Sequence, residues 1–175
     1  GQIPMAGYAD LMRFALLEHY GRTWIDSTVY LTEPIPDMIL NSDFFAVRNS
    51  LLLIDNPVLY PAWFLHAKKG NKTIREIRNV AFAYWLKNEH VIEYLLPNLI
   101  ITLVVKSNPE VEKAIPYMNS DYSEYLVKAL ADDYSEEKWN WIKKLTGIHK
   151  LTYKLETAIN RKDSFYQHII AEKNK

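Results

Sequence analysis

The chain has 175 residues, 49% of them hydrophobic and 24% charged, which is enough to bury one substantial core as a single domain. Its 21 basic residues balance its 21 acidic ones, and a net charge of zero argues against a nucleic-acid-binding protein. Cysteine is absent, which excludes disulfides, thiolate catalysis and zinc-finger sites and fits a reducing compartment.

The apolar segments are too short to cross a membrane. The N-terminal stretch GQIPMAGYAD lacks the basic flank and the apolar run of a signal peptide. The longest apolar run, YLLPNLIITLVV at residues 94–105, is interrupted by Pro97 and Asn98. A bilayer-spanning helix needs about 20 apolar residues, so we expect this run to form a buried helix instead.

The first part of the chain predicts a helix followed by short strands. Residues 8–20 repeat apolar side chains at helical spacing, and Gly21 is typical of a position just past a helix end. The stretch 21–31, GRTWIDSTVYL, predicts a β-strand that the prolines of TEPIPD end. Two strand-like segments follow: FFAVRNSLLLI with one or two short buried strands, and AWFLHAKKGN, which runs into a basic turn.

From Lys72 onward the pattern is helical. We expect one helix over 72–88, a second over about 89–106, shorter ones near 109–117, 121–132 and 135–145, a turn or short strand at 147–154, and a final helix over 155–173. No internal repeat or flexible linker divides the chain. The sequence therefore predicts an α/β fold in which a partial sheet layer is followed by a helix-rich C-terminal part.

One acidic residue, Asp26, interrupts the apolar run at 21–31, and an ionised carboxylate in a half-buried strand needs a partner, a metal or a ligand. Asp10 and Arg13 share one face of the preceding helix, so all three side chains could converge. Such a trio suits a sugar diphosphate, because carboxylates accept hydrogen bonds from hydroxyls and arginine binds charged oxygens. The alternatives are an exposed Asp10–Arg13 ion pair and an Asp26 that only caps a turn.

A second acidic group lies in EHVIE, at residues 89–93. Glu89 and Glu93 are one helical turn apart, a spacing that allows metal ligation. For Glu89 and His90 a solvated helix start is the better interpretation. Glu93 differs, because the helix predicted there becomes wholly apolar after it.

The segment YADLMRFALLEHYGRTWIDSTVYLTEPIP resembles the core of the capsular polysaccharide synthesis glycosyltransferases, relatives of the DxD-containing sugar transferases. The shared pattern is an Ala-Asp pair, an arginine three residues on, a glycine turn, an aromatic-aliphatic-Asp strand and Thr-x-Pro. The resemblance continues through FFAVRN, WFLHAKKGN, VIEYLL and IHKLTYK, and covers roughly residues 6–154. It implies a GT-A-type fold and a bacterial hexosyltransferase. Such an enzyme moves a sugar from a nucleotide-sugar donor to a growing capsular or cell-surface polysaccharide, with retention of the anomeric configuration.

The resemblance also implies roles for individual residues. Asp26 matches the first acid of the DxD motif and is, with Glu93, a candidate catalytic residue. The residues that would hold the donor sugar and its diphosphate are Asp10, Arg13, Thr28, Lys150 and Tyr153. A divalent cation, Mn²⁺ or Mg²⁺, would bind Asp26 and His149. The second DxD acid is replaced by Thr28, whose neutral hydroxyl is a weaker ligand.

Related transferases carry a nucleotide-binding βαβ region ahead of this helix, whereas only eight residues precede Ala9 here. We therefore expect residues 1–175 to correspond to the central and C-terminal parts of a GT-A glycosyltransferase, with an exposed sheet edge that favours homo-oligomers. The expected partners are a nucleotide sugar and a glycan acceptor, and the expected location is the cytoplasm, at the inner face of the membrane. The alternative is a non-catalytic, truncated glycosyltransferase-like fragment or interaction module.

Overall fold

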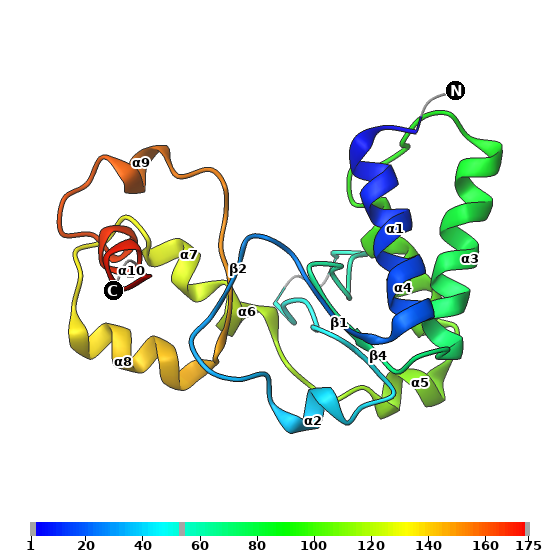
Figure 1. The fold of residues 1–175 in the computed structure, drawn as a ribbon, viewed down its shortest axis with the longest axis horizontal. Coiled ribbons are helices and arrows are strands. Elements are labelled where there is room, and N and C mark those ends of the chain that lie inside the picture. The colour runs from blue at the N-terminus through cyan, green and yellow to red at the C-terminus, as the bar shows by residue number, and fades with distance from the viewer. Residues whose placement is uncertain (1–2, 53–54, 174–175) are drawn as a thin grey trace. The chain divides into compact units, whose positions relative to one another are not determined.

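The structure, a computed structural model, describes residues 3–52 and 55–173 (Figure 1). It divides into two compact units. The first takes in the chain up to Asp26 together with Pro36–Asn119, and the second takes in Ser27–Ile35 together with the chain from Ser120 onward. The fold is mixed α/β, as predicted, and its small sheets are antiparallel.

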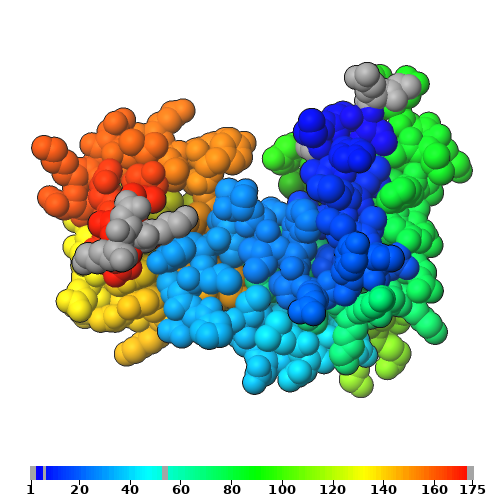
Figure 2. All heavy atoms as spheres, in the orientation of Figure 1, coloured from blue at the N-terminus to red at the C-terminus, as the bar shows by residue number. Residues whose placement is uncertain are grey.

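The first unit is a three-stranded sheet packed against helices. Strand β4 (Phe64–Ala67) lies between β1 (Arg22–Ile25) and β3 (Phe44–Ala46), so β1 and β3 form the two edges. The helices of this unit are α1 (Met5–Tyr20), α2 (Asp37–Leu40), α3 (Lys72–Lys87), α4 (Leu96–Lys106) and α5 (Pro109–Ala114). In the space-filling view the atoms of α1 lie directly against those of α3 (Figure 2). Their facing side chains, with those of β4 and α4, form one apolar core.

Local signals fix the ends of the two long helices. Gly21 ends α1 with φ 70°, a left-handed conformation that glycine adopts without steric cost, and its N–H donates to the carbonyl of Leu17 at 2.8 Å. Asn71 caps α3, because its side-chain oxygen accepts hydrogen bonds from the N–H groups of Thr73 and Ile74. The turn at Gly21 sends the chain directly into β1, beside the central strand.

The second unit is a two-stranded antiparallel sheet covered by short helices. Strand β2 (Val29–Leu31) pairs with β5 (Ile148–Lys150), so that Tyr30 lies opposite His149. The helices are α6 (Ser120–Ser123), α7 (Tyr125–Ala129), α8 (Glu136–Leu145), α9 (Glu156–Ile159) and α10 (Phe165–Lys173). Trp139, Ile142 and Phe165 lie at the centre of its core.

Several predicted elements are confirmed and others are shorter than expected. The helices predicted at 8–20, 72–88 and 135–145 correspond to α1, α3 and α8, and the predicted segment 62–71 contains β4. The single strand predicted over 21–31 is wrong: it is β1 and β2, in two different sheets, separated by a turn at residues 26–28. The segment 44–54 yields β3, although residues 53–54 lie outside the described part.

The later helices are also more broken than predicted. The helix expected over 89–106 begins only at Leu96, because Pro97 fits the first turn of a helix and would break its interior. The segments 121–132 and 155–173 each contain two short helices instead of one, and 109–117 is helical only through Ala114. None of the described helices combines the length and the apolar character needed to span a membrane.

Candidate active site

Arg13 of α1 joins two carboxylates within the first unit. Its Nη2 donates to Oδ1 of Asp26 at 3.2 Å, and its Nη1 lies 3.4 Å from Oδ1 of Asp10. The same Nη1 donates to the main-chain carbonyl of Ala62 at 3.1 Å, which fixes the guanidinium against the segment before β4. The three side chains predicted to converge therefore do so. They pack closely enough that only 11% of the Arg13 side chain remains exposed.

Asp26 has a second partner in Trp24, the residue two positions before it on β1. The indole N–H of Trp24 donates to Oδ1 of Asp26 at 3.1 Å, and the guanidinium carbon of Arg13 lies 5.2 Å from the centre of the Trp24 ring. The backbone N–H of Asp26 donates to the carbonyl of Trp63. Two donors, from Arg13 and Trp24, thus hold Oδ1 of the carboxylate, while 28% of the Asp26 side chain remains exposed.

The environment of Asp10 favours its protonated form more than usual. Burial raises the pKa of this carboxyl, the charge of Arg13 acts in the opposite direction, and the nearby Asp26 raises it further. Its side chain is 21% exposed. Asp10 is therefore a carboxylate that has lost part of its hydration and gains from a hydrogen-bond donor.

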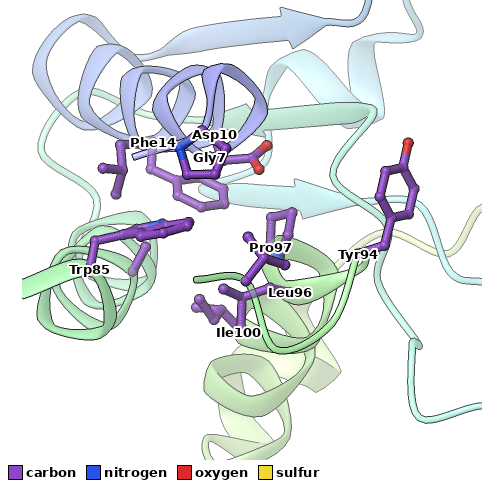
Figure 3. A pocket seen from close by; sticks show the side chains of 12 residues that line it. Gly7, Asp10, Phe14, Trp85, Tyr94, Leu96, Pro97 and Ile100 are labelled. Atoms are coloured by element: carbon purple, nitrogen blue, oxygen red, sulfur yellow. The ribbon is translucent and has the colours of Figure 1, made fainter. Parts of the chain in front are cut away.

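Asp10 also lines a cavity of about 260 Å³ between α1, α3 and the start of α4 (Figure 3). The carboxylate of Asp10 extends from α1 toward the side on which Tyr94 lies. The remaining lining residues are almost all apolar: Pro4, Gly7, Leu11, Phe14, Ala81, Trp85, Val91, Leu96, Pro97 and Ile100. The Asp10–Arg13–Asp26 cluster therefore borders an apolar cavity through one of its carboxylates.

Glu93 lies in the exposed loop between α3 and α4, and not in the helix in which it was predicted. Its carboxylate accepts the N–H of Leu95 at 3.4 Å, and its carbonyl accepts the N–H of Leu96. In the described residues no hydrogen bond or ion pair links it to the Arg13 cluster. Its neighbour Tyr94 lines the cavity. A catalytic role for Glu93 stays a prediction.

The other predicted site residues belong to the second unit. Lys150 donates to the hydroxyl of Thr28 across the β2–β5 pair, and Tyr153 is 75% exposed. His149 is fully buried, with Nε2 3.0 Å from Oγ1 of Thr32, and burial lowers its pKa to about 4. Nδ1 of His149 is buried without a partner in the described residues. The roles of these residues toward a donor stay predictions.

The described residues do not themselves form a metal centre. No group of three or more histidine, aspartate or glutamate side chains is placed to hold an ion in the described part of the chain. Asp10 and Asp26 already share the positive guanidinium of Arg13, and Nε2 of His149 is engaged by a hydroxyl. A divalent cation would need further ligands, such as the phosphate oxygens of a bound donor or water molecules.

Comparison with known proteins assigns the chain. The family model for capsular polysaccharide synthesis proteins matches residues 1–169. The chain belongs to this family. The resemblance predicted from sequence is therefore confirmed, and the family's description indicates a part in capsular polysaccharide synthesis. A search of curated proteins found no match.

Within this capsular polysaccharide synthesis protein, Trp24 is the site residue that sequence reasoning missed. The signal was present, because the aromatic position of the aromatic-aliphatic-Asp pattern is Trp24 itself. Residues two positions apart on a strand lie on the same face of the sheet. The side chains of Trp24 and Asp26 are therefore expected to lie next to each other.

Proposed function

We propose that the protein is a glycosyltransferase that transfers a sugar from a nucleotide-sugar donor to a growing capsular polysaccharide, with retention of the anomeric configuration. Its family supports the setting. The observation that carries the proposal is the pair of partly exposed carboxylates, Asp10 and Asp26, held together by the nearly buried guanidinium of Arg13. In the proposal this cluster binds the donor sugar beside its diphosphate.

Each member of the cluster has a distinct part in the proposed binding. Asp10 and Asp26 accept hydrogen bonds from sugar hydroxyls, which fix the ring before reaction. Oδ1 of Asp26 is engaged by Arg13 and Trp24, and within the described residues no side chain bonds its Oδ2. Oδ2 is therefore the oxygen that a substrate hydroxyl would reach.

Arg13 supplies positive charge in the same proposal. During transfer the bond between the anomeric carbon and the diphosphate oxygen breaks, and the oxygen of an acceptor hydroxyl bonds to that carbon. Negative charge grows on the diphosphate, which takes up the hydroxyl proton as it leaves. A fixed cation with little exposure to water stabilises such charge more strongly than one in solvent. Nε of Arg13 is buried without a partner in the described residues, so the guanidinium meets its surroundings through its two Nη groups.

The test is the release of nucleoside diphosphate by the full gene product that carries this sequence. Uridine- and guanosine-diphosphate sugars are supplied in turn, with Mn²⁺, with Mg²⁺ and with a chelator. Release above the spontaneous rate for at least one donor supports the proposal. If the chelator abolishes this release, the result supports a divalent cation that binds together with the donor. If no donor is turned over, the alternative of a non-catalytic module replaces the proposal.

A further inference from the structure

We infer that the cavity beside Asp10 receives an acetamido group, so that the transferred sugar is an N-acetylhexosamine. This inference rests on the proposed function and names its substrate class. It starts from a mismatch between the cavity and an ordinary hexose. Hexoses carry hydroxyls around the whole ring, whereas the cavity walls are almost wholly apolar.

The apolar walls are built into the packing of α1, α3 and α4. Phe14 is fully buried, and Leu96 and Ile100 are nearly so. The indole of Trp85 lies against α1 at Gly7, where an added Cβ would lie only 2.5 Å from Cζ2 of the indole. The absence of a side chain at Gly7 therefore lets Trp85 form one wall of the cavity (Figure 3).

The polar groups at the cavity are few. Asp10 is its one carboxylate, and Tyr94 and Trp85 are the other lining residues with a polar side-chain group, a hydroxyl and an indole N–H. A sugar hydroxyl enclosed elsewhere in the cavity would lose its water without gaining a partner, which disfavours binding. An acetamido group instead brings one N–H donor and one methyl group. The N–H can donate to the carboxylate of Asp10, and the methyl can lie against Trp85 and Ile100.

Asp10 is suited to accept such a donor. Oδ1 of Asp10 lies beside Nη1 of Arg13, and within the described residues no hydrogen bond is made to Oδ2. Burial has removed part of the water around this carboxylate. An amide N–H from a ligand replaces the lost hydrogen bond, whereas an alkyl chain offers a methyl without a donor.

The size of the cavity agrees with a substituted part of a sugar. The cavity, at about 260 Å³, is far larger than a single water molecule needs. That is room for an acetamido group and the adjoining face of a ring.

The test uses the full gene product and simple methyl glycosides as probes. Methyl N-acetylglucosaminide and methyl N-acetylgalactosaminide are compared by saturation-transfer NMR with methyl glucoside, methyl galactoside and methyl fucoside. We expect an N-acetyl glycoside to bind at least about tenfold more tightly than its parent hexoside, with the strongest saturation on the acetamido methyl. Equal or tighter binding of the hexosides, or of the 6-deoxy fucoside, would overturn the inference.

A pair of adjacent variants ties the binding to the cavity. Val91 lines the cavity and is 39% exposed, whereas Ile92 is 76% exposed and is not a lining residue. Val91→Glu should weaken the binding of the N-acetyl glycoside about tenfold or more, and Ile92→Glu should leave its affinity unchanged. Equal effects of the two changes would overturn the assignment of this cavity.

Failure of the inference and failure of the proposed function give different results. Turnover of a nucleotide hexose, with no preference for its N-acetyl counterpart, overturns the acetamido inference and leaves the glycosyltransferase standing. Binding of N-acetyl glycosides without release of nucleoside diphosphate from any donor supports the cavity assignment and overturns the proposed function.

Discussion

Acid should destabilise the second unit through His149. The ring is fully buried, and burial lowers its pKa to about 4, whereas an unfolded histidine titrates near 6.5. Above pH 6.5 the ring is neutral in both states, and the stability it contributes is fully present. As the pH falls toward 4 the unfolded chain takes up a proton that the folded protein does not, so stability is lost.

The size of this effect follows from the two pKa values. Lowering the pH from 8 to 5 should cost about 2 kcal/mol of the free energy of unfolding. For a protein of this size the loss corresponds to a fall in Tm of about 4–8 °C. Other groups titrate over the same range, so the contribution of His149 has to be isolated by substitution.

The assay is thermal denaturation at pH 8 and pH 5, followed by circular dichroism. His149→Gln keeps an amide that can bond Thr32 but cannot titrate, and His90→Gln changes an exposed histidine as the matched control. The fall in Tm between the two pH values should shrink by about 4–8 °C in His149→Gln and stay unchanged in His90→Gln. The same fall in all three proteins would refute the reasoning. A rise in Tm with Mn²⁺ that His149→Gln removes would instead assign the ring to a metal.

Two further pairs of substitutions test the turn after α1 and the start of α3. Gly21 and Gly70 both have φ 70°, but a Cβ on Gly21 would lie 2.5 Å from the backbone nitrogen of Lys69, whereas at Gly70 the nearest atom is 3.9 Å away on Arg75. Gly70→Ala should therefore lower the free energy of unfolding by about 1–2 kcal/mol, and Gly21→Ala should lower it by clearly more. Urea denaturation measures both losses. Equal losses would contradict the close approach of residue 21 to the backbone of Lys69. Asn71→Ala should lower the free energy of unfolding by about 1 kcal/mol, because α3 loses its cap. Asn71→Asp keeps an oxygen that can cap the helix and should retain most of that stability. Similar losses in the two variants would show that the cap is not the cause.

The parts of the fold that could be predicted from sequence depend on nearby residues. Helical spacing and Gly21 locate α1, and the three-residue spacing of Asp10 and Arg13 puts both on one face. Asp26 could be predicted to lie near Asp10 and Arg13, because the chain turns back directly after the helix. A proline signal for the start of α4 was also present at Pro97, although the longer helix was predicted.

The parts that could not be predicted depend on distant pairing. The segment 21–31 looks like one strand, but Val29–Leu31 pairs with residues more than 100 positions later, which no local pattern reveals. The same pairing decides that His149 is buried opposite Tyr30. The family resemblance implied that His149 is a metal ligand, whereas its burial and its contact with Thr32 depend on the tertiary structure.

The most direct test of the proposed function is the turnover of Asp26→Asn beside Asp43→Asn. Asp26 is held by Arg13 and Trp24, whereas Asp43 forms an exposed ion pair with Lys68 in the same unit. With the donor that the full gene product uses, Asp26→Asn should lose about a hundredfold or more of nucleoside diphosphate release and keep its Tm within a few degrees, while Asp43→Asn keeps its activity. Turnover by Asp26→Asn equal to that of Asp43→Asn would remove Asp26 from the site and contradict the account.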